Sequence, residues 1–567
     1  MTPKFDTYAL DREAVESSTE SDFAMADSSG IADRVPIASM ELLGRGSALA
    51  ILAGVTVAGF VLRLYCLGAK NLWLDEMWSV VVARMPLYSV LWSARTQDPN
   101  AALYNICLHF WMWLGQSEAA VRAFSLVCGV ALIPVMYLLG SQLFQRSVGL
   151  LASALTSVNL FHIQYSQEAR AYSLVVLLVG LSSLFFVRYV EKGALWSWVG
   201  YVLASVLAVY AHIFAILVLA AHVASLVFLR RRDVPWKGLI SAAGATGLGI
   251  VPLGMLVFER TRSPFVVFKW IPQPTVRRVY DLFYSLAGNA NYYGIEIRHN
   301  IANKALFAIY CVVCLVTLSL AIRSWLSAKP SAETWRQGLL FVWLFLPIAV
   351  VLGFSILVQS WFINRYLLIC LPALVLIAAQ GVGALRPSWL AVTAFATILI
   401  TSFAGLPQYY RYRIQYQEWK ATTDYIVSHQ RPGDGAVFCV AHGRLLFEYY
   451  RDKDHLPTQS SDLDLAYPDL KNQDTDPRAL SYFPSLSDDQ ISAMVVQHQR
   501  VWFVLYPDDW VPGYETSRHI EAALTRNFNR VSETKQYTVI IRLYSNDDVA
   551  GRLTGGAQDV PTDLLPR

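Results

Sequence analysis

The sequence predicts a polytopic α-helical membrane protein with a small α/β domain at its C-terminal end. The 567 residues are 55% hydrophobic and only 16% charged, and the mean hydropathy is +0.39. A soluble protein usually carries about 25% charged residues, so the deficit indicates lipid as the solvent. Apolar runs of membrane-spanning length recur as far as residue 406, and beyond it short apolar runs alternate with helical patterns.

The first segment, residues 1–45, is polar and acid-rich and contains no long apolar run. It lacks the basic, apolar and cleavage regions of a secretory signal peptide. Its composition is typical of a disordered tail, which we expect to lie in the cytoplasm.

Eleven predicted membrane spans follow within residues 46–406. Each approaches or exceeds the ~17–25 residues that cross a ~30 Å hydrocarbon core. The spans are 48–67, 119–141, 147–164, 171–190, 195–211, 213–229, 238–257, 304–323, 337–358, 366–383 and 388–406. An odd number of spans places the two ends of the chain on opposite sides of the membrane.

Basic residues set the orientation, because Lys and Arg collect in cytoplasmic loops. With the N-terminus inside, the inner loops hold Arg146, Arg188, Lys192, Arg230, Arg231, Arg232, Lys237, Arg323, Lys329, Arg336 and Arg386. The short outer turns hold only Arg170 and Arg365. This bias predicts a cytoplasmic N-terminus and an extracytoplasmic C-terminal domain.

Two predicted outer loops, 68–118 and 258–303, are long. The second carries Arg260, Arg262, Lys269, Arg277, Arg278 and Arg298. An anionic phosphate held at the outer surface would favour a basic loop there, whereas the alternative is that long loops translocate with little regard to charge.

Residues 407–545 are predicted to form the soluble α/β domain, followed by a disordered tail at 546–567. Its predicted helices are 418–430, 443–451 and 515–527, and its predicted strands are 435–441, 501–506 and 537–544. The domain shows no metal-ligand spacing and no phosphate-binding loop, and the seven cysteines of the chain indicate no disulfide framework.

Unusual polar residues of the membrane region all fall on the predicted outer side. They occur in residues 72–76, 97–99 and 164–172, at His212, and in residues 364–366. An ionisable side chain at membrane depth costs roughly 2.5–3.5 kcal/mol on insertion scales, so such residues indicate function by default. Their convergence predicts one active site at the outer face.

In order and sidedness these segments resemble the GT-C glycosyltransferases, in particular the branch of glycosyltransferase family 39 related to protein O-mannosyltransferases and aminoarabinose transferases. The segments that carry the resemblance are 63–65 (RLY), 72–76 (LWLDE), 98–104 (DPNAALY), 117–122 (SEAAVR), 166–172 (SQEARAY) and 365–366 (RY). It covers roughly residues 48–406 and implies a GT-C-like membrane fold. Similar proteins often have two prolines where this chain has Ala101 and Ala102, a departure that loosens the loop and bears on the acceptor.

The resemblance implies transfer of a sugar from a polyprenyl-phosphate carrier to a hydroxyl on a protein, lipid or glycan acceptor outside the cytoplasm. With the compact loops, it predicts the inner (plasma) membrane as the location and membrane lipids as further partners. A net charge of +4 is too small to indicate nucleic acid. Asp75 is the candidate general base, since a positioned carboxylate typically contributes ~10²–10⁴-fold. The leaving phosphate needs cations, for which Arg170, Arg365 and the basic residues of 258–303 are candidates.

Glu76 is the second candidate catalytic residue, although on a helix it points about 100° away from Asp75 and so binds acceptor or supports its neighbour. Asp75 itself also suits a helix N-cap. The other candidate substrate-binding residues are Asp98, Tyr104, Glu168, Arg170, His212, Arg365 and Tyr366.

Five of these residues also have a structural interpretation. Asp98 precedes a proline and suits a turn, Glu168 and Arg170 can form an ion pair at a helix end, His212 can be a hydrogen-bonded interface residue, and Arg365 can extend to the interface.

No cofactor is predicted. The carboxylates Asp75, Asp98 and Glu168 leave Mg²⁺ or Mn²⁺ open as an alternative, but no dedicated ligand spacing is present. Two other functions remain as alternatives: a transporter or flippase of a lipid-linked sugar, and a non-catalytic membrane assembly subunit. A transporter should show polar residues near the bilayer midplane and broken helices in matched halves. A subunit would leave the acidic outer loop unexplained.

Overall fold

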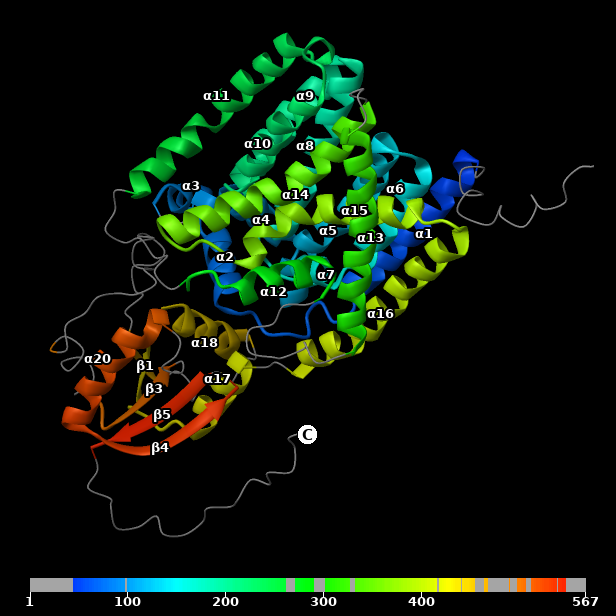
Figure 1. Cartoon of the computed structure of the whole chain (residues 1–567). Helices are drawn as coiled ribbons and strands as arrows, with labels where there is room; N and C mark the ends of the chain where they lie inside the picture. The colour runs from blue at the N-terminus through cyan, green and yellow to red at the C-terminus, as the bar shows by residue number, and fades with distance from the viewer. Residues whose placement is uncertain are drawn as a thin grey trace, which may run out of the picture.

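The computed structural model describes residues 44–96, 99–261, 271–289, 301–326, 332–415, 418–439, 441–453, 463–467, 489, 497–505, 511–537 and 539–546. In this part the chain forms a helix bundle, followed by a five-stranded sheet with its own helices (Figure 1). We call the segment from Glu418 to Ser545 the C-terminal α/β region, and the end of the bundle that faces it the sheet side.

The bundle confirms that the chain is a polytopic membrane protein. Within the described ranges, eight helices are long and apolar enough to cross a membrane. They are α1 (Arg45–Leu64), α5 (Glu118–Leu143), α8 (Tyr172–Lys192), α11 (Trp236–Thr261), α13 (Ile301–Leu326), α14 (Ala332–Leu357), η8 with α15 (Asn364–Cys370 and Leu371–Ala384) and α16 (Ser388–Gln415). The predicted spans 195–211 and 213–229 are the shorter apolar helices α9 (Leu195–Ala211) and α10 (Ala215–Ser225), the second extended by η4 (Leu226–Phe228).

One predicted span, 147–164, is two helices rather than one. Helix α6 (Arg146–Val158) ends at Asn159, whose side chain accepts a hydrogen bond from the His162 amide at 3.0 Å and so caps α7 (Leu160–Ser166). An asparagine side chain competes in this way with the backbone bonds of a continuous helix. The buried Arg63 guanidinium donates to the carbonyls of Thr156 and Ser157 at 3.0 and 2.9 Å, so the last carbonyls of α6 keep a donor.

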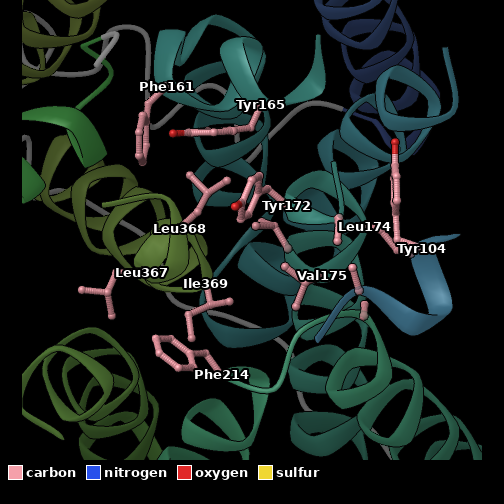
Figure 2. Packing of buried hydrophobic residues seen from close by; sticks show 14 of the residues in the cluster. Tyr104, Phe161, Tyr165, Tyr172, Leu174, Val175, Phe214, Leu367, Leu368 and Ile369 are labelled. Atoms are coloured by element: carbon pink, nitrogen blue, oxygen red, sulfur yellow. The ribbon is translucent and has the colours of Figure 1, made fainter. Parts of the chain in front are cut away.

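The centre of the bundle is the element made of η8 and α15: in its apolar 18-residue stretch 94% is buried, whereas in that of α1 only 17% is buried. Leu367 and Leu368 of η8 are fully buried, and Leu368 lies near Tyr165 and Tyr172 of α7 and α8 (Figure 2). This apolar packing holds η8 and the start of α8 in fixed relative positions. Polar residues at the ends of these elements therefore have a rigid base.

Short helices fill the first long loop and part of the second. The first loop contains α2 (Leu74–Arg84), α3 (Leu87–Thr96), η2 (Pro99–Ala101), α4 (Ala102–Trp111) and η3 (Met112–Leu114), and the second contains α12 (Val276–Leu286). Helices α2 and α12 lie on the sheet side (Figure 1). Acidic residues occupy the first turn of α2, where the helix dipole favours them.

The C-terminal α/β region has the strand order β2-β1-β3-β5-β4. Its elements are α17 (Glu418–His429), β1 (Gly435–Phe438), α18 (Ala441–Lys453), β2 (Asp464–Tyr467), β3 (Arg500–Leu505), α20 (Val511–Asn527), β4 (Asn529–Gln536) and β5 (Val539–Ser545). Strand β1 runs parallel to β2 and β3, while β5 runs antiparallel to β3 and β4. The predicted strands correspond to β1, β3 and β5.

Strands β2 and β4 were absent from the prediction. β4 is an edge strand of mostly exposed polar residues (NRVSETKQ), and β2 has only four residues. Neither has the apolar run by which a buried strand is found from sequence. The predicted borders at residues 46, 407 and 546 remain predictions.

Candidate functional site

The candidate site lies where four elements meet on the sheet side of the bundle. These are the first turn of α2, the turn between α7 and α8, the turn between α9 and α10, and η8. They bring together Asp75, Arg170, His212, Arg365 and Tyr366, which come from four separate parts of the sequence. We call these five residues the candidate site.

Asp75 lies opposite a guanidinium group. Its Oδ2 is 3.3 Å from Nη2 of Arg365, and the two side chains are 18% and 7% exposed. The same guanidinium lies over the rings of Trp73 and Tyr366, at 5.5 and 5.7 Å from their centroids. An arginine held over aromatic rings keeps a fixed orientation, so its charge points at a defined place.

Arg170 is the second cation beside Asp75. Its Nη1 donates to the main-chain carbonyl of Asp75 at 3.0 Å and to Oγ of Ser79 at 3.1 Å. The amide of Arg170 donates to the carbonyl of Glu168 at 2.8 Å, which makes the turn between α7 and α8 tight. Arg170 thus fixes the first turn of α2 and brings a second positive charge to the backbone of Asp75.

Glu76 points into the protein. Its carboxylate is fully buried and accepts from Nε and Nη2 of Arg122, both at 2.8 Å. It also accepts from the amide of Ala169 at 2.8 Å. Burial alone would raise the pKa of Glu76, but the Arg122 guanidinium outweighs burial and holds that pKa below its usual value.

Arg122 also binds the backbone of the segment before α2. Its guanidinium also donates to the carbonyls of Leu67, Lys70 and Asn71, at 3.0, 2.7 and 3.0 Å. The Glu76 pair therefore joins α2, α5, the turn before α8 and the 67–71 segment.

His212 is a buried neutral ring at the inner wall of the candidate site. Asn100 Oδ1 accepts from the Ile213 amide at 2.8 Å, and Asn100 Nδ2 lies 3.2 Å from Nε2 of His212. Burial first, and then the charges of Arg170 and Arg365, lower the pKa of His212 to about 3. The ring lies 5.2 Å from that of Tyr366, so the two form an aromatic wall beside the two guanidinium groups.

Tyr104 and Glu168 are buried, and both are connected to the turn that carries Arg170. The hydroxyl of Tyr104 pairs with Oγ of Ser125 at 3.0 Å, and that Oγ donates to the carbonyl of Arg170 at 3.2 Å. Tyr104 is fully buried, and Glu168 is buried in the turn that carries Arg170. Asp98 lies outside the described residues.

Several members of the arrangement were not named as site residues from the sequence. Each of them contacts a residue that the sequence does predict: Trp73 contacts Arg365 and Ser79 contacts Arg170. Asn100 contacts His212, and Arg122 contacts Glu76. Trp73, Asn100 and Arg122 fall inside the segments that carry the family resemblance, so those segments were the available signal. Among the described residues, no group of three or more His, Cys, Asp or Glu side chains is arranged to hold a metal ion.

The comparisons with known proteins agree with this architecture. Residues 99–253 match the family described as dolichyl-phosphate-mannose-protein mannosyltransferase. No curated protein matches the chain in sequence.

Among solved structures, ArnT from Cupriavidus metallidurans in the apo state superposes with a TM-score of 0.57 at 12% identity, covering 88% of this chain and 98% of that one. The same protein bound to undecaprenyl phosphate gives 0.55 at 14% identity, with 89% and 99% covered. The Archaeoglobus fulgidus oligosaccharyltransferase in the apo form gives 0.48 at 10% identity, with 89% and 75% covered. The family match over residues 99–253 and the ArnT structures agree with the resemblance, and the superposition shows that the chain has the fold of ArnT.

Proposed function

We propose that this chain, with its GT-C fold, is a membrane glycosyltransferase that moves a sugar from a polyprenyl-phosphate donor to an acceptor hydroxyl. The observation that carries the proposal is the Asp75 carboxylate, which faces the Arg365 guanidinium at 3.3 Å, while Arg170 binds the main-chain carbonyl of the same residue. Similarity to ArnT, which has been solved with undecaprenyl phosphate, supports this donor class.

The proposed reaction uses one base and two cations. The acceptor oxygen attacks the anomeric carbon of the sugar, the bond from that carbon to the phosphate oxygen breaks, and the acceptor proton passes to the Asp75 carboxylate. The polyprenyl phosphate leaves with the bonding electron pair. Arg365 and Arg170 stabilise the negative charge that grows on it.

The Asp75–Arg365 pair gives the donor a defined effect on the base. The guanidinium that faces Asp75 at 3.3 Å is also the one that we propose binds the arriving donor phosphate. A phosphate bound there shares the positive charge of this guanidinium with Asp75. Donor binding and the charge beside the base are thereby linked in one residue.

The neutral ring of His212 and that of Tyr366 suit the sugar rather than the phosphate. Flat aromatic rings pack against the C–H face of a sugar, and polar groups beside them bind its hydroxyls. The Arg365 guanidinium lies 5.7 Å from the centroid of the Tyr366 ring, so the donor phosphate and the sugar bind next to each other in the candidate site.

We place the sheet side outside the cytoplasm, in the inner (plasma) membrane, on the distribution of basic residues across the predicted loops. The prenyl tail then stays in lipid while the reacting carbon lies at the outer interface. The arginines provide the charge stabilisation, and the proposed mechanism requires no metal ion. The acceptor is a protein, a lipid or a glycan hydroxyl.

The decisive experiment compares purified wild-type protein and Asp75→Asn with a panel of radiolabelled polyprenyl-phosphate sugars. We expect transfer by wild type and a loss of at least about a hundredfold in the variant, because asparagine keeps the shape but removes the base. Asp424→Asn is the matched control, since it breaks an exposed Asp–Lys pair (3.3 Å to Lys420) in the C-terminal α/β region.

Two results would count against the proposal. Transfer retained by a folded Asp75→Asn protein would remove Asp75 from the mechanism. No transfer by wild type from any donor in the panel would remove the glycosyltransferase function.

A further inference from the structure

The C-terminal α/β region touches the segment that leads into the candidate site. The main-chain amide of Leu72 donates to the hydroxyl oxygen of Tyr450 at 2.8 Å. The neighbouring Tyr449 hydroxyl donates to the carbonyl of Gln116 at 3.3 Å, and its ring lies 5.3 Å from the guanidinium carbon of Arg84. Both tyrosines belong to α18, which packs against α2.

These tyrosines are enclosed by the contact. Tyr450 is 2% exposed and Tyr449 is 8% exposed, and their rings meet edge to face with centroids 5.0 Å apart. A region joined to the bundle only by its linker would leave such side chains in solvent. α18 is therefore docked on the bundle (Figure 1), and the hydroxyl groups of both tyrosines bond to main-chain atoms.

The segment 67–72 is held from two sides. Arg122 binds three of its carbonyl oxygens, as described above. A guanidinium has only donors, so it cannot serve the amide of Leu72, and the Tyr450 hydroxyl supplies that acceptor. Arg122 of the bundle thus binds carbonyl groups of this segment, and Tyr450 of α18 binds its Leu72 amide.

This contact is close to the proposed base in the sequence. Helix α2 begins at Leu74, two residues after Leu72, and Asp75 lies in its first turn. A short, stiff connection passes any displacement of Leu72 on to Trp73 and Asp75. A misplacement of about 1 Å at a reacting group can cost on the order of a hundredfold in rate.

We propose that Tyr450 is a positioning residue for sugar transfer, which holds the Leu72 amide and so fixes the start of α2 and the Asp75 carboxylate. The proposal rests on the function proposed for Asp75. The C-terminal α/β region would then contribute to sugar transfer, because a residue of α18 binds the segment that positions the base.

The test uses full-length protein in lipid nanodiscs, with Tyr450→Phe as the variant and Tyr449→Phe as the matched control. Each variant loses one hydroxyl group from the same interface, but only the first loses the acceptor for Leu72. Hydrogen exchange is followed by mass spectrometry in overlapping peptides that cover residues 67–78. We expect exchange at the Leu72 amide to become about tenfold faster in Tyr450→Phe and to stay unchanged in Tyr449→Phe.

The second measurement is transfer kinetics. We expect kcat to fall about tenfold in Tyr450→Phe with a smaller change in the donor KM, because the loss acts on the start of α2, which carries the base, whereas Arg170 and Arg365 come from other elements. In Tyr449→Phe we expect both constants to remain near the wild-type values. A merely structural role would lower the amount of active protein equally in the two variants and would not single out kcat.

Unchanged exchange at Leu72 in Tyr450→Phe, or equal losses in the two variants, would overturn the proposal. Faster exchange with a wild-type kcat would also overturn it, since the amide would be released without effect on the base. If the wild-type protein transfers no sugar from any donor, the proposed function is wrong, and so is the proposed role of Tyr450 in transfer. The exchange measurement still decides in that case whether α18 holds Leu72.

Discussion

Replacing Glu76 by glutamine tests whether this residue anchors α2 or takes part in the chemistry. The carboxylate accepts two hydrogen bonds from Arg122 and one from the Ala169 amide, all at 2.8 Å and all buried. Glutamine keeps the shape but replaces one acceptor oxygen by an NH₂ donor. That NH₂ then faces another donor, and the Arg122 charge loses its counter-ion.

Breaking a buried ion pair by removing one partner costs about 3–5 kcal/mol. Each 1.4 kcal/mol is tenfold in an equilibrium constant. We therefore expect the ratio of folded to unfolded protein to fall by a factor on the order of 10² to 10³ or more in Glu76→Gln. The measurement is unfolding in mixed detergent and SDS micelles, with Glu533→Gln as the control because Glu533 pairs with Arg542 at 2.8 Å near the protein surface.

The pH dependence of this difference has a definite sign. Arg122 holds the pKa of Glu76 below the value of about 4.3 that an unperturbed glutamate has. The stabilisation by Glu76 is therefore complete above that value and is lost as the pH falls through the lower, folded-state pKa. We expect the stability gap between wild type and Glu76→Gln to be constant from pH 8 to about pH 5 and to shrink in stronger acid.

One result would refute this reasoning. If Glu76→Gln unfolds within about 0.5 kcal/mol of wild type but loses transfer a hundredfold or more, the anchoring role is wrong. Glu76 would then be a catalytic residue, as the sequence first suggested.

Four further predictions concern the candidate site and the topology. Arg365→Lys should raise the donor KM and lower kcat, together about 10- to 100-fold in kcat/KM, because lysine cannot give the two-pronged contact with phosphate; steady-state kinetics checks this, and unchanged constants would exclude a phosphate contact. The pKa of His212, about 3, lies below the ordinary 6.5, so the folded state stays unprotonated there while the unfolded state gains a proton. Wild-type stability should therefore decline relative to His212→Asn as the pH falls from 7 to 5, and parallel unfolding curves would contradict the shift. Transfer should keep at least about half its rate in EDTA, since the arginines supply the positive charge, and loss restored by Mg²⁺ or Mn²⁺ would establish a metal site. A cysteine at the exposed Ser428 should react with a membrane-impermeant maleimide in intact cells, whereas one at the exposed Arg231 should react only after permeabilisation; the reverse pattern would invert the orientation.

The spans could be predicted from the sequence because hydropathy is a local property. The lengths of the apolar runs at 301–326 and 332–357 are enough to predict spans there, whatever these helices pack against. The break at Asn159 could not be predicted in the same way. A single asparagine in an apolar run is tolerated in many helices, and here the break depends on Arg63, almost a hundred residues away, which serves the freed carbonyls.

The candidate site was predictable as a set of residues but not as a set of contacts. Sidedness brought Asp75, Arg170, His212 and Arg365 to one face, since all follow or precede spans on the same side. The sequence contains no information on which arginine faces Asp75, because Arg365 is 290 residues away and its direction is set by the packing of η8 on α8. The C-terminal contact through Tyr450 is also long-range, and a tyrosine in a helix gives no local sign of it.

Asp75 and Glu76 show how adjacent carboxylates acquire different roles from one helix. Successive residues on a helix point about 100° apart, so a single turn can direct one side chain to the site and its neighbour into the protein. Glu76 is fully buried, meets a fixed counter-ion and stays charged, which makes it unsuited to exchange a proton with an acceptor. Asp75 is partly exposed, and its partner Arg365 is also a candidate ligand for phosphate, so its charge environment changes when a donor arrives. A base must lie within hydrogen-bond distance of the acceptor proton, so the turn that carries Asp75 has to be rigid. The buried Glu76–Arg122 pair holds that turn in place.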